Sequence, residues 1–266
     1  MSVILDNVCY KDKINNISYT FLDREINVIT GGSGKSLLTY LMLGLVRLDR
    51  GSISVNNHKI DKNTKRFYNI RKDIGYVFQD ARYEFFCKNC YLELEFSMKR
   101  YKIKDNINKK IKSIFKMIDL PYSYLSKSPF ELSSGEQVKL AFGIALIHNP
   151  SILILDDITV NIDSKTKKMF LELIKRLRDK YNKTIIIISN DIDFILDVGD
   201  NIIVLDNGNI KCSIRKDDIV SNIDVIKNYI ELPKIIEFIY LYNKCKNKRI
   251  DYTLDINLLL EDIINE

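Results

Sequence analysis

The chain has 266 residues, 46% of them hydrophobic, and a formal net charge of +6. This length fits one large domain or one domain with an appendage, and the apolar content suffices for a substantial core. The basic residues form neither a basic helix nor an aromatic platform, so we expect no nucleic-acid partner. Five scattered cysteines without a signal peptide indicate a reducing cytosol, and no apolar run has the length of a membrane span.

Apolar patterning predicts an α/β domain over the first 215 residues. Alternating or continuous apolar runs predict strands at residues 2–9, 14–21, 25–30, 52–55, 73–78, 151–156, 184–189, 202–206 and 209–214. Helical spacing of apolar residues predicts helices at residues 37–48, 107–118 and 165–181. From about residue 217 the chain is predicted to be helical to its end, with Pro233 in the first turn of one helix.

The change of character after Gln79 predicts a subdomain inserted between strands. Residues 80–130 are rich in lysine and show helical periodicity. An amphipathic helix follows, with Ser133 or Ser134 as its N-cap, and ends at about His148. We therefore expect a helical subdomain at about residues 80–148.

The stretch Gly31-Gly32-Ser33-Gly34-Lys35-Ser36 lies between a predicted strand and a predicted helix, as in a phosphate-binding loop. Glycines let consecutive N–H groups turn toward phosphate oxygens. Lys35 would reach the β- and γ-phosphates, and the Ser36 hydroxyl would ligate Mg²⁺. The full pattern G-x-x-x-x-G-K-[ST] requires glycine at position 29, where the chain has Ile29. If Gly31 is the leading glycine instead, the loop is two residues short; the remaining alternative is a plain helix-capping turn.

Five features in one order resemble the nucleotide-binding subunit of ABC transporters. They are the phosphate loop, Gln79 after a strand, the string LSSGE at 132–136, ILILDD at 152–157, and Asn190 after the strand at 184–189. The resemblance implies an α/β P-loop NTPase of the ABC type over residues 1–215. It also implies an antiparallel β subdomain, the inserted helical subdomain at about 80–148, and a C-terminal helical extension at 216–266 that contacts a second subunit.

Looser matches resemble the energy-coupling factor ATPases within that family. Residues 79–86 resemble that group's Q-x-P-x-x-Q-[LI]-F, with Glu84 in the place of its second glutamine. Residues 93–96 resemble its D-V-A-F, and residues 129–132 resemble its P-F-x-L. The predicted helical tail after Leu232 is similar to the C-terminal extension of that group.

The resemblance implies a sandwich of two subunits, with ATP and Mg²⁺ bound between the phosphate loop of one chain and the LSSGE signature of the other. Tyr10 corresponds to the aromatic residue that stacks on adenine. The residues implied to bind ATP are Tyr10, Gly31, Gly32, Ser33, Gly34, Lys35, Ser36, Leu37, Ser133, Ser134, Gly135, Glu136 and Asp163. Mg²⁺ is assigned to Ser36, Gln79 and Asp156. Catalysis and γ-phosphate sensing are assigned to Asp157, Gln79 and Asn190.

Several catalytic positions depart from the family pattern. Asp157 stands where the family has a glutamate, so its carboxyl is one methylene shorter, and Asn190 replaces a histidine that could become an imidazolium. Ser134 replaces a glycine of the usual L-S-G-G-Q string, and Glu136 replaces its glutamine. Residues 161–163 depart from the usual D-loop while keeping Asp163. We therefore expect a site that binds nucleotide and turns it over slowly or not at all.

The function expected from the resemblance is that of an ATP-binding subunit of an energy-coupling factor importer for a vitamin or metal ion. Its partners would be a second ABC ATPase, in a heterodimer rather than a homodimer, a membrane coupling subunit held through the helical subdomain, and a separate substrate-binding membrane subunit. The chain would sit peripherally on the cytoplasmic face of the membrane. Two alternatives stay open: a fully competent ATPase subunit of another ABC importer, and a nucleotide-binding regulatory protein without a transport role.

Overall fold

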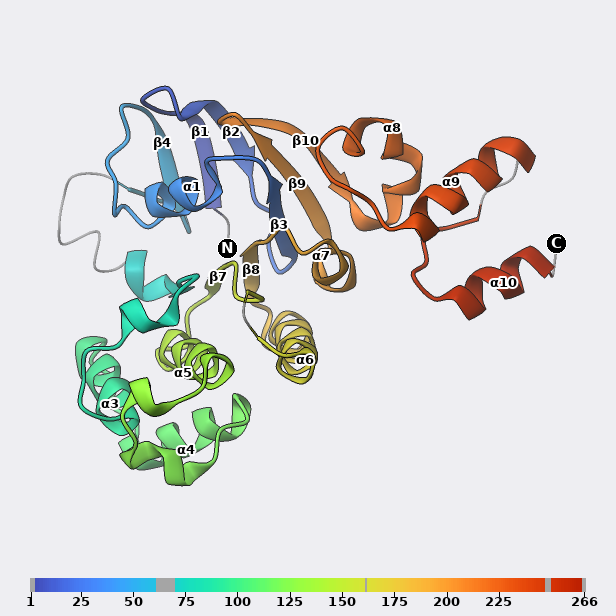
Figure 1. Ribbon diagram of the computed structural model, residues 1–266. Coiled ribbons are helices and arrows are strands. Elements are labelled where there is room, and N and C mark those ends of the chain that lie inside the picture. Colours follow the sequence, from blue (N-terminus) through green and yellow to red (C-terminus); the bar gives the residue numbers. More distant parts are fainter. Residues whose placement is uncertain (1–2, 61–69, 161, 247–249, 265–266) are drawn as a thin grey trace.

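The computed structural model describes residues 3–60, 70–160, 162–246 and 250–264, and it contains two sheets (Figure 1). The larger sheet has the strand order β10-β9-β3-β8-β7-β6. Its strands are β3 (Ile26–Gly31), β6 (Ile74–Val77), β7 (Ile152–Asp156), β8 (Thr184–Ile188), β9 (Asn201–Asp206) and β10 (Asn209–Arg215). All neighbouring pairs are parallel except β9 and β10, which form a hairpin.

The smaller sheet is antiparallel and has the order β2-β1-β4-β5. Its strands are β1 (Val3–Tyr10), β2 (Ile14–Thr20), β4 (Arg50–Val55) and β5 (His58–Lys59). This sheet is the antiparallel β subdomain implied by the resemblance. The short strand β5 was not predicted.

The central sheet lies between two layers because its buried strands place alternate residues on opposite faces. Ile154 and Ile186 pack with β1, β4 and the helix α1 (Lys35–Met42) in one core cluster. Leu153 and Ile187 pack in a second cluster with the helices on the other face. The ribbon in Figure 1 shows α1 on the side of the small sheet and α5 and α6 on the opposite side.

The remaining helices form the insert, the second face and the tail. The α-helices are α3 (Cys90–Arg100), α4 (Ile107–Met117), α5 (Ser134–Leu146), α6 (Ser164–Tyr181), α7 (Ile192–Val198), α8 (Ile223–Ile226), α9 (Lys234–Lys246) and α10 (Ile256–Ile264). Short 3-10 helices are η1 (Ala81–Glu84), η2 (Tyr122–Ser126), η3 (Pro129–Glu131), η4 (Lys216–Asp218) and η5 (Val220–Asn222). Within the described ranges, no helix is both long and apolar enough to cross a bilayer.

Two predicted helical stretches differ from the structure. The helix predicted at 37–48 ends at Met42, because Leu43 caps it and Gly44 then takes a left-handed φ of 61°. The tail is not continuously helical: η4, η5 and α8 are short turns before α9 begins just after Pro233. The apolar residues of these turns give a helix-like spacing because they contact the main core at Ile219, Ile223 and Ile226.

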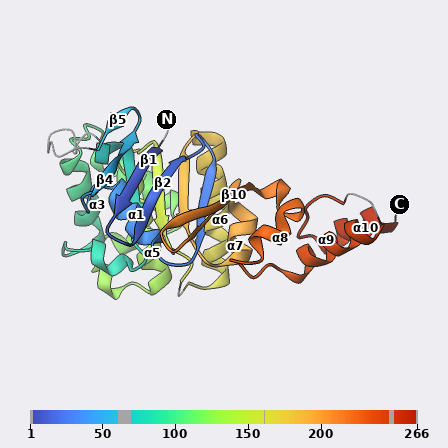
Figure 2. The same cartoon turned by 90° about the horizontal axis from the view of Figure 1, so that it is seen from above.

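The insert and the tail extend from the body in different directions. In Figure 1 the helices α3, α4 and α5 form a lobe below the central sheet. Figure 2 shows α8, α9 and α10 projecting from the β10 side as an arm. The arm is tied to the body by contacts such as that of the Tyr252 hydroxyl, which donates to the Leu196 carbonyl at 3.3 Å.

Candidate nucleotide-binding site

The phosphate loop is shorter than the full pattern. Strand β3 continues through Gly31, which pairs with Leu205 of β9, and α1 begins at Lys35. Ile29 is a fully buried strand residue, so Gly31 is the leading glycine. Only Gly32 and Ser33 separate it from Gly34, where the full pattern has four residues. Gly31 and Gly34 have φ values of 103° and 104°, a region that only glycine adopts without strain.

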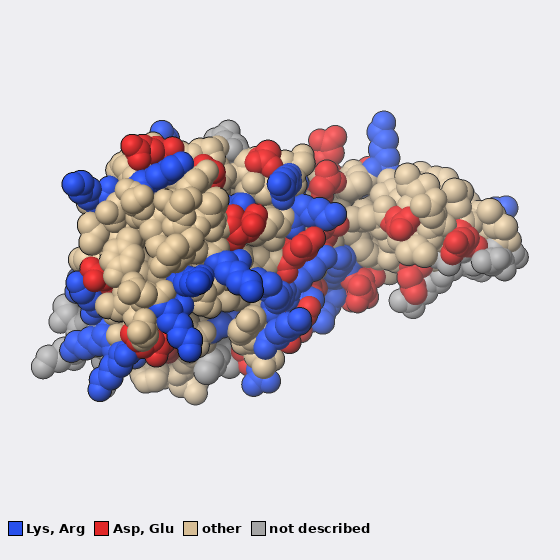
Figure 3. Space-filling view, turned by 90° about the horizontal axis from the view of Figure 1, so that it is seen from below, with Lys and Arg blue, Asp and Glu red and all other residues tan. Residues whose placement is uncertain are grey.

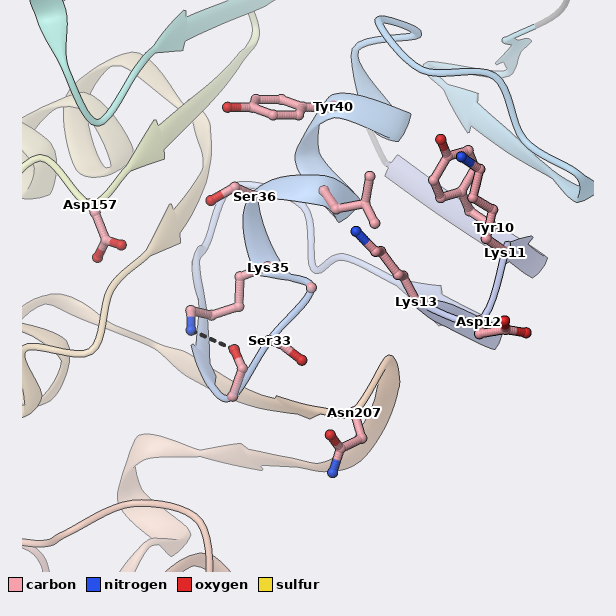
Figure 4. A pocket seen from close by; sticks show the side chains of 13 residues that line it. Tyr10, Lys11, Asp12, Lys13, Ser33, Lys35, Ser36, Tyr40, Asp157 and Asn207 are labelled. Carbon is pink, nitrogen blue, oxygen red and sulfur yellow. Dashed lines mark hydrogen bonds between the residues drawn. The ribbon is translucent and has the colours of Figure 1, made fainter.

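Lys35 folds back onto this loop. Its Nζ donates to the carbonyl oxygens of Gly31 at 2.6 Å and Gly32 at 2.7 Å, one of which is drawn in Figure 4. Burial lowers the pKa of Lys35, while Asp157 and Asp156 act in the opposite direction. The ammonium group therefore already lies where a phosphate-binding lysine is needed, held by carbonyls that a phosphate would replace as its partners.

Asp156 ends β7 with both carboxylate oxygens engaged. The Ser36 hydroxyl donates to Oδ1 at 3.1 Å, and the Tyr76 hydroxyl donates to Oδ2 at 2.8 Å. Burial raises the pKa of Asp156, while the hydrogen bonds from Tyr76 and Ser36 and the charge of Lys35 oppose the rise. A hydroxyl and a carboxylate are the oxygen donors that Mg²⁺ prefers, so the donor set fits that ion.

Tyr76 was not among the predicted site residues. Its backbone pairs with Ile154 in the parallel β6–β7 ladder, so its side chain shares a face with Asp156 two residues further on. Thr39 lies beside it, with 3.3 Å between the two hydroxyl oxygens. An aromatic hydroxyl in a strand next to the aspartate strand is the sequence signal that could have identified this contact.

Asp157 and Asn190 meet the loop from two neighbouring strands. Asp157 has a left-handed φ of 46°, and its N–H donates to the Ile188 carbonyl at 2.9 Å. Burial raises the pKa of the Asp157 carboxyl and Asp156 adds to the rise, whereas Lys35 opposes it. The Asn190 Oδ1 accepts from the Thr30 hydroxyl and from the Gly31 N–H, each at 3.3 Å.

A cleft of about 690 Å³ opens over the loop, a size typical of small-molecule sites. Eight of the predicted residues line it (Figure 4): Tyr10, Gly32, Ser33, Gly34, Lys35, Ser36, Leu37 and Asp157. Five residues from outside the prediction complete the lining: Lys11, Asp12, Lys13, Tyr40 and Asn207. Gly31 and Asn190 instead line a neighbouring cleft of about 510 Å³ with residues 229–234.

The signature segment lies outside this cleft. Ser133 caps α5 in a reciprocal capping box, accepting from the Glu136 N–H at 3.4 Å while its own N–H donates to the Glu136 carboxylate at 2.9 Å. Burial tends to raise the pKa of Glu136, but the hydrogen bonds from Ser133 outweigh it and hold this pKa below its ordinary value. Of the two N-cap alternatives, the structure therefore has Ser133, with Ser134 as the first helical residue.

Gln79, Gly135 and Asp163 also do not line the Lys35 cleft. Gln79 lines a third cleft, of about 430 Å³, together with Ser134 and Val160. Asp163 caps α6 by accepting from the Thr166 N–H at 2.9 Å, and Gly135 packs against Thr166. Asn161, part of the predicted D-loop, lies outside the described residues. A single chain thus brings together the phosphate loop, the hydrogen-bonded Ser36 and Asp156, and Asn190. Its signature residues 133–136 lie outside the cleft over the loop.

Glu84 is an unusual carboxyl at the entry to the helical subdomain. It accepts from the Phe78 N–H at 2.7 Å, one residue before Gln79. Glu93, which is 1% exposed, accepts from the Phe86 and Cys87 N–H groups at 2.6 Å each. Burial raises the pKa of Glu84 to about 8, and the charge of Glu93 adds to the rise. At neutral pH the protonated Glu84 resembles the glutamine expected at this position.

A strand, a glycine loop, a Lys-Ser pair on a helix and a carboxylate on the adjacent strand define a nucleotide-binding P-loop protein. A family model described as "ABC transporter" matches residues 14–160. The "Energy-coupling factor transporter ATP-binding protein EcfA2" of Mycoplasma capricolum subsp. capricolum is 32% identical over 265 residues, covering 94% of this chain and 91% of that protein. The chain therefore belongs to the ABC transporter family and, within it, to the energy-coupling factor ATP-binding proteins.

Solved structures show the same fold. The structure of cbiO1 from Clostridium perfringens, described as part of the ABC transporter complex cbiONQ, has a TM-score of 0.73, 25% identity, and coverage of 89% of this chain and 97% of that one. The dimeric, post-hydrolysis structure of the ATP-binding cassette MJ0796 with ADP and Pi has a TM-score of 0.72, 26% identity, and coverage of 80% and 98%. The ABC ATPase fold and the ATPase class are thereby confirmed.

Replacing Tyr76 with phenylalanine should destabilise the site, because Asp156 Oδ2 would lose its part-buried donor. Hydrogen bonds to charged groups contribute about 1.5–3 kcal/mol, so we expect a loss of that order in the free energy of unfolding, measured by urea denaturation. Tyr40→Phe, on the open wall of the cleft, is the matched control and should change it much less. Equal effects of the two variants would contradict this account of the Asp156 contacts.

Replacing Glu84 with glutamine should change how stability depends on pH. The folded chain keeps the Glu84 proton up to about pH 8, whereas the unfolded chain releases it near 4.5, so this group makes the free energy of unfolding fall as pH rises between these values. Glu84→Gln should be the more stable protein at pH 9, by on the order of 2–4 kcal/mol, and near wild type at pH 5. Urea denaturation across this range measures it. The exposed Glu172→Gln should follow wild type throughout, and a Glu84→Gln curve parallel to wild type would refute the assignment.

Proposed function

We propose that the chain is the ATP-binding subunit of an energy-coupling factor importer that closes over ATP together with a second ATPase and turns over its own nucleotide slowly. The observation that carries this proposal is that the binding groups of the site match the family pattern, whereas its catalytic groups do not. The groups suited to binding, Lys35, Ser36 and Asp156, are in place, while Asp157 and Asn190 stand where the family has stronger catalytic groups.

In this proposal Lys35 exchanges the carbonyls of Gly31 and Gly32 for phosphate oxygens, and Ser33, Gly34 and the first turn of α1 supply N–H donors at a positive helix end. Ser36 and Asp156 hold Mg²⁺, which when bound neutralises charge on the phosphates. Tyr10 forms the adenine end of the cleft. The Tyr76 hydroxyl continues to donate to Asp156 Oδ2, and this hydrogen bond keeps the carboxylate oriented toward the ion.

The slow turnover follows from two replacements. The Asp157 carboxyl is one methylene shorter than a glutamate and starts from a left-handed backbone, which Asp adopts more readily than Glu. The Asn190 amide is held by Thr30 and Gly31 and cannot become cationic. General acid–base assistance contributes roughly 10²–10⁴ in rate, so weakening it lowers hydrolysis more than binding.

The second ATPase follows from the position of the signature. Because Ser133, Ser134, Gly135 and Glu136 lie away from the chain's own Lys35 cleft, we propose that the N-terminus of α5 faces the nucleotide of another chain. The dimeric structure of MJ0796 supports such a pairing. Two unlike chains would tolerate one slow site, and for this reason we propose a heterodimer.

The arm offers an apolar surface for that dimer. Large exposed apolar side chains on α9 and α10 are 48–76% exposed: Phe238, Leu241, Ile256, Leu258, Leu260 and Ile264. Figure 3 shows that the arm presents few charged side chains on this face, whereas the body carries many. Apolar surface of this kind marks protein contacts, and we propose that residues 216–266 contact the second subunit.

The membrane coupling subunit would bind the helical subdomain. Tyr83, Phe86 and Phe96 are 84%, 65% and 47% exposed, and the Phe86 and Phe96 rings pack edge to face at 4.7 Å. This aromatic patch begins at Tyr83, four residues after Gln79 in the chain, so a partner on it could respond to the nucleotide state. A separate membrane subunit would select the vitamin or metal ion, with the chain peripheral on the cytoplasmic face.

ATP turnover separates this proposal from a fully competent ATPase. Purified alone, the chain should hydrolyse ATP slowly, and Asp157→Glu combined with Asn190→His should raise its turnover at least about tenfold. Co-purified with the ATPase encoded nearest to it, the pair should be active, and Lys35→Ala should leave much of that turnover. Fast turnover by the wild-type chain alone, abolished by Lys35→Ala, would show that Asp157 and Asn190 suffice.

A charge within the aromatic patch should release the membrane partner. Phe96→Asp places a carboxylate at the centre of the proposed contact, so co-purification with the membrane coupling subunit should fall at least about tenfold while ATP binding persists. Tyr181→Asp, at a similarly exposed position on α6, is the control and should leave the complex intact. Retention of the complex by Phe96→Asp would place the membrane contact elsewhere.

A further inference from the structure

The shortened loop has few free N–H groups for a phosphate chain. The Gly31 N–H donates to Asn190 Oδ1 at 3.3 Å, and the Gly32 N–H donates to the Leu205 carbonyl at 2.8 Å. The Gly31 N–H is thus occupied by Asn190 and the Gly32 N–H by β9. Only the segment from Ser33 onward remains to turn its N–H groups toward the cleft, so the backbone supplies a thinner cradle than a full-length loop.

Negative charges around the loop add to this shortage of phosphate-binding groups. Asp157 lines the cleft, and the Asp206 carboxylate packs against the back of Gly32, with Oδ1 2.4 Å from the position a Cβ would take there. Among the described residues, Lys35 supplies the ammonium group that bonds to the loop, and the carboxylates of Asp156 and Asp157 act on the same group. A nucleoside triphosphate carries several negative charges, so a cationic side chain in addition to Lys35 and Mg²⁺ would strengthen its binding.

Lys13 is placed to supply it. It ends the turn between β1 and β2, where its N–H donates to the Tyr10 carbonyl at 3.1 Å. Its carbonyl oxygen lies 3.5 Å from the position of a Gly34 Cβ and 2.3 Å from that of a Gly208 Cβ, so the turn packs directly on the loop. A side chain at Gly208 would displace this turn.

The two lysines of the turn point in different directions. The Lys11 Nζ lies over the Tyr10 ring, 5.3 Å from its centroid. Lys13 extends from the turn into the cleft toward α1, and it lines the same cleft as Ser36 and the loop residues (Figure 4). Lys13 is exposed, so its ammonium is free to follow a bound anion, and Lys11 provides a neighbour of equal charge that faces the adenine end.

We propose that Lys13 is a second phosphate-binding lysine, which contacts the phosphate chain of the nucleotide opposite Lys35 and compensates for the two residues missing from the loop. The inference rests on the proposed binding of ATP in this cleft. It names a role for the β1–β2 turn beyond that of Tyr10, and it makes the antiparallel subdomain part of the phosphate site.

Calorimetric titration of the full chain with ATP, ADP and AMP in the presence of Mg²⁺ tests this role. Lys13→Ala should weaken ATP binding about tenfold and AMP binding less, because the contact is to the phosphate chain. The affinity of the variant should also depend less steeply on salt concentration. Lys13→Arg should restore most of the ATP affinity, since it restores the charge.

Lys59→Ala is the matched control, since it removes an equal charge from an exposed position on β5 of the same antiparallel sheet, outside the cleft, and it should leave the ATP affinity within about twofold of wild type. Wild-type affinity in Lys13→Ala, or an equal loss in Lys59→Ala, would overturn the assignment. A wild-type chain that binds no ATP would instead refute the proposed function, so the two failures are distinguishable.

Discussion

The register of four parallel strands determines which side chains meet at the site. Ile188 of β8 pairs with Ile29 on one side and with Asp156 on the other. The residues that follow these positions, Gly31, Asn190 and Asp157, therefore reach the same edge of the sheet. A slip of one residue would turn Asp156 to the opposite face and separate it from Ser36 and Tyr76. The continuous isoleucine and leucine runs hold this register because both faces of the strands are buried.

The same register explains the short loop. Because β3 stays paired with β9 through Gly31, the chain leaves the sheet later than the full pattern allows and enters α1 after only three residues. Backbone N–H groups that pair within the sheet are then not available to bind phosphate oxygens. A site of this shape depends more on side-chain cations than on backbone donors, and long lysine side chains adapt to ligand position better than a rigid loop.

Sequence patterns could predict the parts of the site that depend on local order. The strand, glycine loop, Lys35 and Ser36 follow from spacing, and Asp156 follows from its place after an apolar run. Tyr76 and Glu84 could not be assigned this way, because their roles arise from contacts across strands and from burial of a carboxyl. The choice of Gly31 over position 29 depended on strand pairing with Leu205, a long-range contact that the glycines alone do not encode. The end of α1 at Met42 was missed for a similar reason, since leucines at helical spacing continue beyond it into a turn.

Nucleotide binding and nucleotide hydrolysis depend on different residues at this edge of the sheet. Hydrolysis can therefore weaken while binding is kept. Binding depends on the charge of Lys35 and on the Ser36–Asp156 pair, whose carboxylate is oriented by the part-buried Tyr76 hydroxyl. Turnover depends on how far the Asp157 carboxyl reaches and on what Asn190 can donate. The Asp157 backbone is hydrogen-bonded to Ile188 and the Asn190 amide to Gly31. The positions of both residues are therefore set by the sheet and not by a bound nucleotide. A chain built this way would keep its contribution to closing a two-subunit sandwich after its own hydrolysis had become slow, provided that the partner chain supplied the hydrolysis that reopens it.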